Sequence, residues 1–191
     1  MRSYFDILET GKKLELDAEA LQSKYYKLSR KNHPDLFLSK GEAEYKKALD
    51  ESSLINKAYN TLKDPITRAN YILEIDAPQI ANEKSNIVHN DLLEDVMEMQ
   101  EKIGDYHEAS GDSKEALKKE LELIRTGLSQ KMESLKAEMN KIFNEYDNSN
   151  EASKKDSILK KLKSELHKRN YMNTLIRTID HEIFGAEVIR H

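Results

Sequence analysis

The chain has 191 residues, enough for one domain or two small ones. Charged residues make up 35% and hydrophobic residues 38%, and Gly and Pro number only 6 and 3, which favours helices over sheets. A net charge of −4 provides no general basic excess for nucleic-acid binding. The sequence contains no cysteine, which excludes disulfides and thiolate ligands for a metal or an iron–sulfur cluster.

Membrane insertion and export are not indicated. No apolar run approaches the roughly 20 residues that a membrane-spanning helix needs. Residues 1–9 lack the basic region and apolar stretch of a secretory signal. We therefore expect a cytoplasmic protein without membrane contact.

The first 75 residues are predicted to form helices around one loop. After a short helix or turn, Asp17 can cap a helix whose apolar face carries Leu21, Tyr25 and Leu28. Pro34 disfavours helix at the preceding residue, so this helix must end there and residues 33–41 are expected to be a loop. A third helix then carries an apolar stripe made of Ala48, Leu49, Ser52, Ile55, Tyr59 and Leu62.

The pair Asp64-Pro65 ends that helix and begins a short one, because an Asp cap before Pro is typical of a helix start. The composition changes at residues 76–88, around Pro78. We therefore place a linker there, with one domain at 1–75 and another at 89–191.

Three helical segments are predicted beyond the linker. The first spans about 88–107, and its core face carries Leu92, Val96, Met99 and Ile103. The second and third carry long apolar stripes over 117–146 and 158–183, with breaks near Gly111 and Asp147. The sequence thus predicts an all-α protein with a C-terminal three-helix bundle.

One constellation carries the functional prediction. His33-Pro34-Asp35 lies between two antiparallel helices, and Pro34 limits the backbone freedom that the loop would lose on binding. The helix before it bears a basic face formed by Lys24, Lys27 and Lys31, which Arg30 flanks. A stripe of like charge steers an acidic partner, and Asp35 can accept hydrogen bonds from an arginine.

This arrangement resembles a J-domain, in which a basic helix and a His-Pro-Asp loop are followed by a long helix. The match covers residues 2 to about 75. The resemblance implies that the loop and the basic helix contact the nucleotide-binding domain of a DnaK/HscA-type chaperone and accelerate its ATP hydrolysis. It assigns this docking role to His33, Pro34, Asp35, Lys24, Lys27, Arg30 and Lys31.

Further residues resemble the HscB family of iron–sulfur co-chaperones, namely Tyr4-Phe5, Leu36-Phe37, Ile55 to Tyr59, and Arg68-Ala69 with Tyr71. The resemblance implies an adaptor without a cofactor that brings an iron–sulfur scaffold protein of the IscU type to the chaperone. It places the scaffold site on Leu93, Glu94, Met97, Glu98, Glu101, Asp105 and Tyr171. Glu94 departs from the family pattern, which usually has an apolar residue at this position.

Several alternatives stay open at this stage. The lysine stripe also fits an ordinary solvated helix face, and Leu93 and Met97 also fit the bundle core. A general J-domain co-chaperone with another client or an oligomerising bundle is the second functional hypothesis. A hydrolase using His33 and Asp35 ranks last, because the sequence offers neither a nucleophile nor a metal site beside them.

Overall fold

A computed structural model describes residues 2–83 and 92–185, and every element in these ranges is helical. The prediction of an all-α fold is confirmed. The elements are α1 (Tyr4–Ile7), α2 (Ala18–Lys31), the 3₁₀ helix η1 (Pro34–Lys40), α3 (Glu42–Lys63), α4 (Pro65–Asp76), α5 (Pro78–Asn82), α6 (Leu93–Glu108), α7 (Gly111–Asn148) and α8 (Ala152–Phe184).

The described chain divides into two compact units. The first contains the residues up to Asn82 together with Ile142–Lys160, which are the end of α7 and the start of α8. The second contains the described residues from Glu83 to Lys141 and from Lys161 onward. The bounds proposed from sequence, 1–75, 76–88 and 89–191, stay a prediction.

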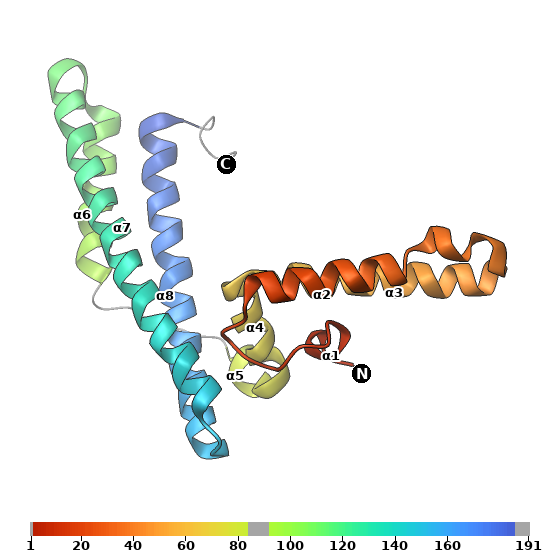
Figure 1. Cartoon of the computed structure of the whole chain (residues 1–191). Helices are drawn as coiled ribbons and strands as arrows, with labels where there is room; N and C mark the ends of the chain where they lie inside the picture. The colour runs from red at the N-terminus through yellow and green to blue at the C-terminus, as the bar shows by residue number, and fades with distance from the viewer. Residues whose placement is uncertain (1, 84–91, 186–191) are drawn as a thin grey trace. The chain divides into compact units, whose positions relative to one another are not determined.

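The antiparallel pair α2 and α3 dominates the first unit, with η1 at its tip (Figure 1). Asp17 caps α2 as predicted, since its Oδ1 accepts from the backbone N–H groups of Glu19 and Ala20 at 2.9 and 3.0 Å. Asp64 likewise caps α4, with Pro65 as its first residue. These local caps set where each helix starts.

The predicted loop at residues 33–41 is more ordered than expected, because Pro34–Lys40 forms a 3₁₀ helix. Gly41 then takes a positive φ of 92°, a conformation that glycine adopts at no steric cost, and its carbonyl accepts from Tyr45 in the first turn of α3. The chain therefore reverses direction between α2 and α3 through a defined turn.

The predicted linker is partly helical. Helix α4 continues to Asp76, and α5 follows at Pro78–Asn82 with Ile80 buried. Residues 84–91, which hold the rest of the predicted linker and the predicted start of the next helix, lie outside the described residues.

The end of α7 joins the first unit through hydrogen bonds as well as apolar packing. The Asp147 carboxylate accepts from the backbone N–H groups of Leu14 and Glu15 at 2.7 and 2.8 Å. Next to it, the buried Tyr146 donates its hydroxyl to Asp76, which also pairs with Lys12 at 2.6 Å. Burial and the bond to Asp76 raise the pKa of Tyr146.

The second unit buries apolar side chains of α6, α7 and α8, as the predicted stripes require. Its buried residues include Leu92, Met99, Leu121, Leu128, Leu135, Met139, Leu162, Leu166, Met172, Leu175 and Ile179. In the part of the chain that the structure describes, no helix is long and apolar enough to cross a membrane.

We predict that Asp147→Asn lowers the free energy of unfolding by about 1–3 kcal/mol, because the amide cannot accept from both backbone N–H groups of residues 14 and 15. Urea denaturation measures the change. Glu145→Gln is the matched control, since Glu145 is exposed on the same helix. Equal stability of the two variants would contradict a structural role for the Asp147 carboxylate.

Candidate functional site

His33 and Asp35 lie on the exposed tip of the α2–α3 pair. The extended backbone of His33, with φ −63° and ψ 128°, is the conformation that a following proline favours. His33 Nδ1 accepts from the backbone N–H of Asp35 at 3.4 Å and lies 3.5 Å from its Oδ2. In the neutral imidazole this leaves the proton on Nε2. The side chains are 55% and 73% exposed, so both are free to meet a partner.

Aromatic stacking holds the two helices together two turns before the tip. The Tyr25 and Tyr59 rings stack with centroids 4.1 Å apart, and Tyr25 donates its hydroxyl to Asn56 at 2.9 Å. Lys63 Nζ lies 5.6 Å from the centre of the Tyr59 ring. These contacts fix α2 against α3 and hence the direction in which the basic face of α2 points.

The basic face of α2 separates into one tethered and three available cations. Lys24 is half-buried, and its Nζ donates to the carbonyl of Glu9 at 2.6 Å. Lys27, Arg30 and Lys31 are exposed, and no carboxylate in residues 2–83 or 92–185 forms an ion pair with them. We call these three residues the basic ridge. Pairing of Lys24 with the chain itself was not foreseen, because a distant backbone carbonyl leaves no signal in the sequence.

Arg68 anchors the base of the same helix pair. It is 5% exposed, and its Nε and Nη1 donate to the carbonyls of Leu14 and Leu62 at 2.8 and 2.5 Å. Burial lowers the pKa of Arg68, and the carboxylates of Asp64, Asp147 and Glu15 oppose that shift.

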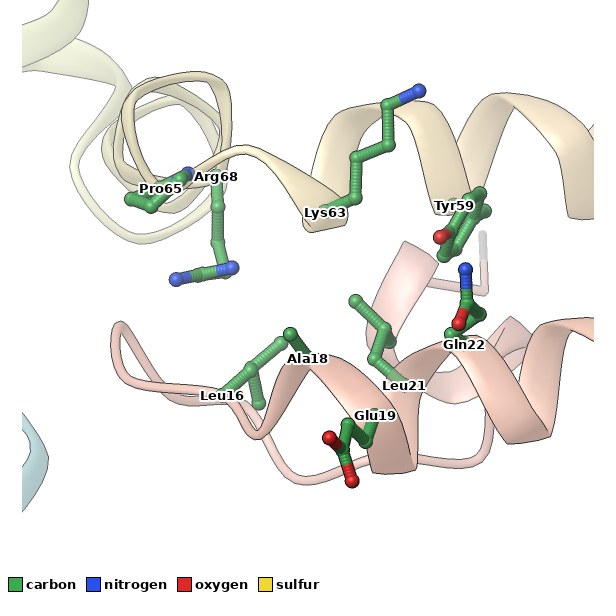
Figure 2. A pocket seen from close by; sticks show the side chains of 9 residues that line it. All are labelled: Leu16, Ala18, Glu19, Leu21, Gln22, Tyr59, Lys63, Pro65 and Arg68. Carbon is green, nitrogen blue, oxygen red and sulfur yellow. The ribbon is translucent and has the colours of Figure 1, made fainter.

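Figure 2 shows the Arg68 side chain extending from α4 toward the segment that carries Leu16, across a cavity of about 390 Å³. The cavity is bounded by the start of α2 and the end of α3, and Leu21 and Tyr59 also line it. Its polar groups have mixed charge, with Glu19 and Lys63 both present. Through its bonds to the carbonyls of Leu14 and Leu62, Arg68 joins the segment before α2 to the end of α3.

The second predicted site lies on α6. Leu93 and Met97 are 48% and 63% exposed, whereas Leu92 and Met99 are buried and Val96 is half-buried. The core alternative that the sequence left open for Leu93 and Met97 is therefore wrong. Both side chains are accessible to a partner.

The flanks of α6 explain this exposure. Asp95 pairs with Lys131 at 2.5 Å and Lys102 with Glu120 at 2.7 Å. The flank of α6 that carries Asp95 and Lys102 therefore lies against α7. Leu93 and Met97 project from the opposite flank of the buried residues by helical geometry.

Tyr171 of α8 is also exposed, and an ion pair indicates its height along the bundle relative to Met97. His107 of α6 pairs with Glu182 of α8 at 2.9 Å. Going back ten residues on each helix, about 15 Å, brings Met97 level with Met172, the residue after Tyr171. The predicted apolar residues Leu93, Met97 and Tyr171 are therefore compatible with one surface of the second unit.

The predicted acidic residues form one row on α6. Glu94, Glu98, Glu101 and Asp105 are all exposed at the spacing i, i+4, i+7 and i+11, which keeps them on one face of the helix. No ion pair joins these four to a cation in the described ranges. We call Leu93, Met97 and this acidic row the α6 strip.

The described residues hold no cluster of three His, Asp or Glu side chains suited to a metal ion. Two residues near the tip, Leu36 and Leu38, are exposed. From sequence Leu36 contributed only to the resemblance to the HscB family, and Leu38 to nothing, since apolar residues in a presumed loop have no periodicity to interpret.

The fold and the His-Pro-Asp tip define a J-domain, and the family model described as DnaJ domain matches residues 3–71. Within this class, the predicted resemblance to HscB is confirmed. The chain is 34% identical over 102 residues to co-chaperone protein HscB of Proteus mirabilis (strain HI4320), an alignment that covers 53% of this chain and 59% of that relative.

Two solved structures have the same fold. Chaperone HscB from Vibrio cholerae matches with a TM-score of 0.63 at 23% identity, over 94% of this chain and 96% of that one. The human co-chaperone protein HscB matches with a TM-score of 0.63 at 22% identity, over 96% and 83%. The likeness in fold therefore extends over both compact units, beyond the sequence match.

We predict that Arg68→Lys lowers the free energy of unfolding by about 1–3 kcal/mol, because one ammonium group cannot replace two guanidinium bonds to separate buried carbonyls. Thermal and urea denaturation measure the loss. Arg30→Lys makes the same change on the exposed face of α2 and should alter stability by less than about 0.5 kcal/mol. If both variants unfold alike, Arg68 does not anchor the base of the helix pair.

Proposed function

We propose that the chain is a co-chaperone in iron–sulfur cluster assembly. Its J-domain tip docks on a DnaK/HscA-type chaperone and stimulates the ATPase of that partner, and its α6 strip binds an iron–sulfur scaffold protein of the IscU type. The chain supplies binding surfaces, and the ATP hydrolysis belongs to the partner.

The observation that carries the proposal is the exposure of His33 and Asp35 beside the basic ridge. A fixed turn presents the two side chains, so little conformational entropy is lost when they bind. The three ridge cations have no described carboxylate partner, which leaves them available to an acidic surface.

The α6 strip supports the second half of the proposal. Exposed large apolar side chains edged by charge are characteristic of protein-binding surfaces. The unpaired acids select a partner whose contacting face is basic. An iron–sulfur scaffold protein is the partner that the sequence resemblance to the HscB family implies for this surface.

We expect His33→Gln and Asp35→Asn each to reduce the stimulation of a purified HscA-type ATPase by about tenfold or more, because each removes a group that contacts the partner directly. Steady-state ATP turnover with and without the chain measures the effect. Circular dichroism and melting should be unchanged, since both side chains are exposed.

A charge control accompanies these variants. Lys27→Glu should weaken activation most at low ionic strength, while Lys57→Glu makes the same change on an exposed position of α3 and should have little effect. Full activation by His33→Gln would remove the basis of the proposal.

We expect the double variant Leu93→Ser, Met97→Ser to weaken binding of the scaffold protein by about tenfold or more through the loss of two apolar contacts. Titration calorimetry with the scaffold protein measures the affinity. Leu123→Ser is the matched control, since Leu123 is an exposed leucine on α7.

The ATPase and binding measurements on the wild-type chain separate the second functional hypothesis, a general J-domain co-chaperone, from the first. If the wild-type chain activates the ATPase but does not bind the scaffold protein, it is a general J-domain co-chaperone with another client. If it binds the scaffold protein and the double variant binds equally well, the α6 strip is not the binding surface.

A further inference from the structure

Two leucines directly after the His-Pro-Asp tip are unusually exposed. Leu36 and Leu38 are 57% and 66% exposed, among the highest values for large apolar residues in the described chain. Phe37 between them is half-buried, with Lys40 Nζ 4.5 Å from its ring centre. The turn therefore faces Phe37 inward and leaves its neighbours to solvent.

The geometry of η1 explains this alternation. In a 3₁₀ helix the side chains at i and i+3 eclipse, so three rows run along its length. Pro34, Phe37 and Lys40 form one row, and the half-burial of the first two shows that it faces the helix pair. The packing of η1 against α3 agrees with this orientation.

The other two rows of η1 begin at Asp35 and His33 and run away from the His-Pro-Asp tip. Leu38 follows Asp35 by one 3₁₀ turn, a rise of about 6 Å, on the same edge. Leu36 similarly follows His33, the cap of the helix. A partner surface that reaches both His33 and Asp35 therefore meets a leucine beside each of them.

We propose that Leu36 and Leu38 form an apolar docking contact continuous with the His-Pro-Asp tip, and that the same ATPase chaperone covers it. The inference rests on the proposed function and adds a requirement on the partner. The partner surface must place an apolar patch next to the acidic region that faces Lys27, Arg30 and Lys31.

Charge and position favour this occupant over others. The two leucines adjoin the basic ridge through the tip, and Lys40 adds a further exposed cation at the end of η1. A basic client surface would be repelled there, whereas an acidic one is attracted. The partner that binds the ridge is therefore the one positioned to bury the leucines.

The division of roles predicts a particular kinetic effect. The leucines contribute contact area, and His33 and Asp35 contribute the polar groups. Loss of the leucines should weaken docking without removing the groups that act once docked. The concentration needed for activation should rise, and the maximum activation should remain.

The test uses the full chain carrying Leu36→Gln and Leu38→Gln in a titration of ATPase stimulation with a purified HscA-type chaperone. We expect the concentration for half-maximal stimulation to increase roughly tenfold. The increase should be the same at low and high salt, because an apolar contact is not screened. Leu123→Gln on α7 is the control and should activate like wild type.

The outcomes separate this inference from the proposed function. If the double leucine variant activates at the wild-type concentration while His33→Gln fails, the apolar contact is refuted and the proposed function stands. If the wild-type chain fails to stimulate the ATPase, the proposed function itself fails, and this inference with it.

A second copy of the chain is the competing occupant. Sedimentation velocity on wild type and the double variant distinguishes the two. Dimers of wild type that disappear in the variant, with activation unchanged, would assign the leucines to self-association and overturn the inference. Unchanged melting and circular dichroism establish that the variant is folded.

Discussion

The backbone of Leu14, through its N–H and its carbonyl, makes the two contacts on which the arrangement of the first unit depends. Its N–H donates to the Asp147 carboxylate at 2.7 Å, and its carbonyl accepts from the Arg68 guanidinium at 2.8 Å. Leu14 is itself completely buried. One irregular residue is thus fixed by an anion and a cation that come from helices far away in the sequence.

The position of the Leu14 backbone sets where the chain enters α2. Three residues later Asp17 caps the helix, so the rotation of α2 about its axis is fixed at its start. From there the helical repeat dictates that Lys27, Arg30 and Lys31 face solvent while Leu21 faces α3. The exposed tip is therefore oriented by buried polar contacts at the opposite end of the same helix.

Local chemistry made much of this fold predictable. The caps Asp17 and Asp64 act within three residues of themselves, and the apolar stripes give the helices directly. The turn at residues 33–41 was predicted only as a loop, because nothing in its composition distinguishes a 3₁₀ helix from irregular backbone. Its three rows, and so the exposure of Leu36 and Leu38, follow only from that geometry.

Long-range contacts were not predictable from the sequence. Asp147 looked like part of a break between two helices, yet its partners lie more than 130 residues away. For the α6 strip, periodicity alone left Leu93 and Met97 as either core or surface. Which flank of α6 meets α7 is decided by the pairs of Asp95 with Lys131 and Lys102 with Glu120, and spacing within α6 carries no information about them.

The two exposed surfaces share one construction with opposite charge. Each has large apolar side chains beside charges that have no described intramolecular partner, cationic at the tip and anionic on α6. Exposed ion pairs would contribute little to stability, so leaving these charges unpaired costs the fold almost nothing. Under the proposed function the opposite signs also separate the two partners, because each surface repels the protein that the other attracts. Under that function, a chaperone and a client would not compete for the same surface.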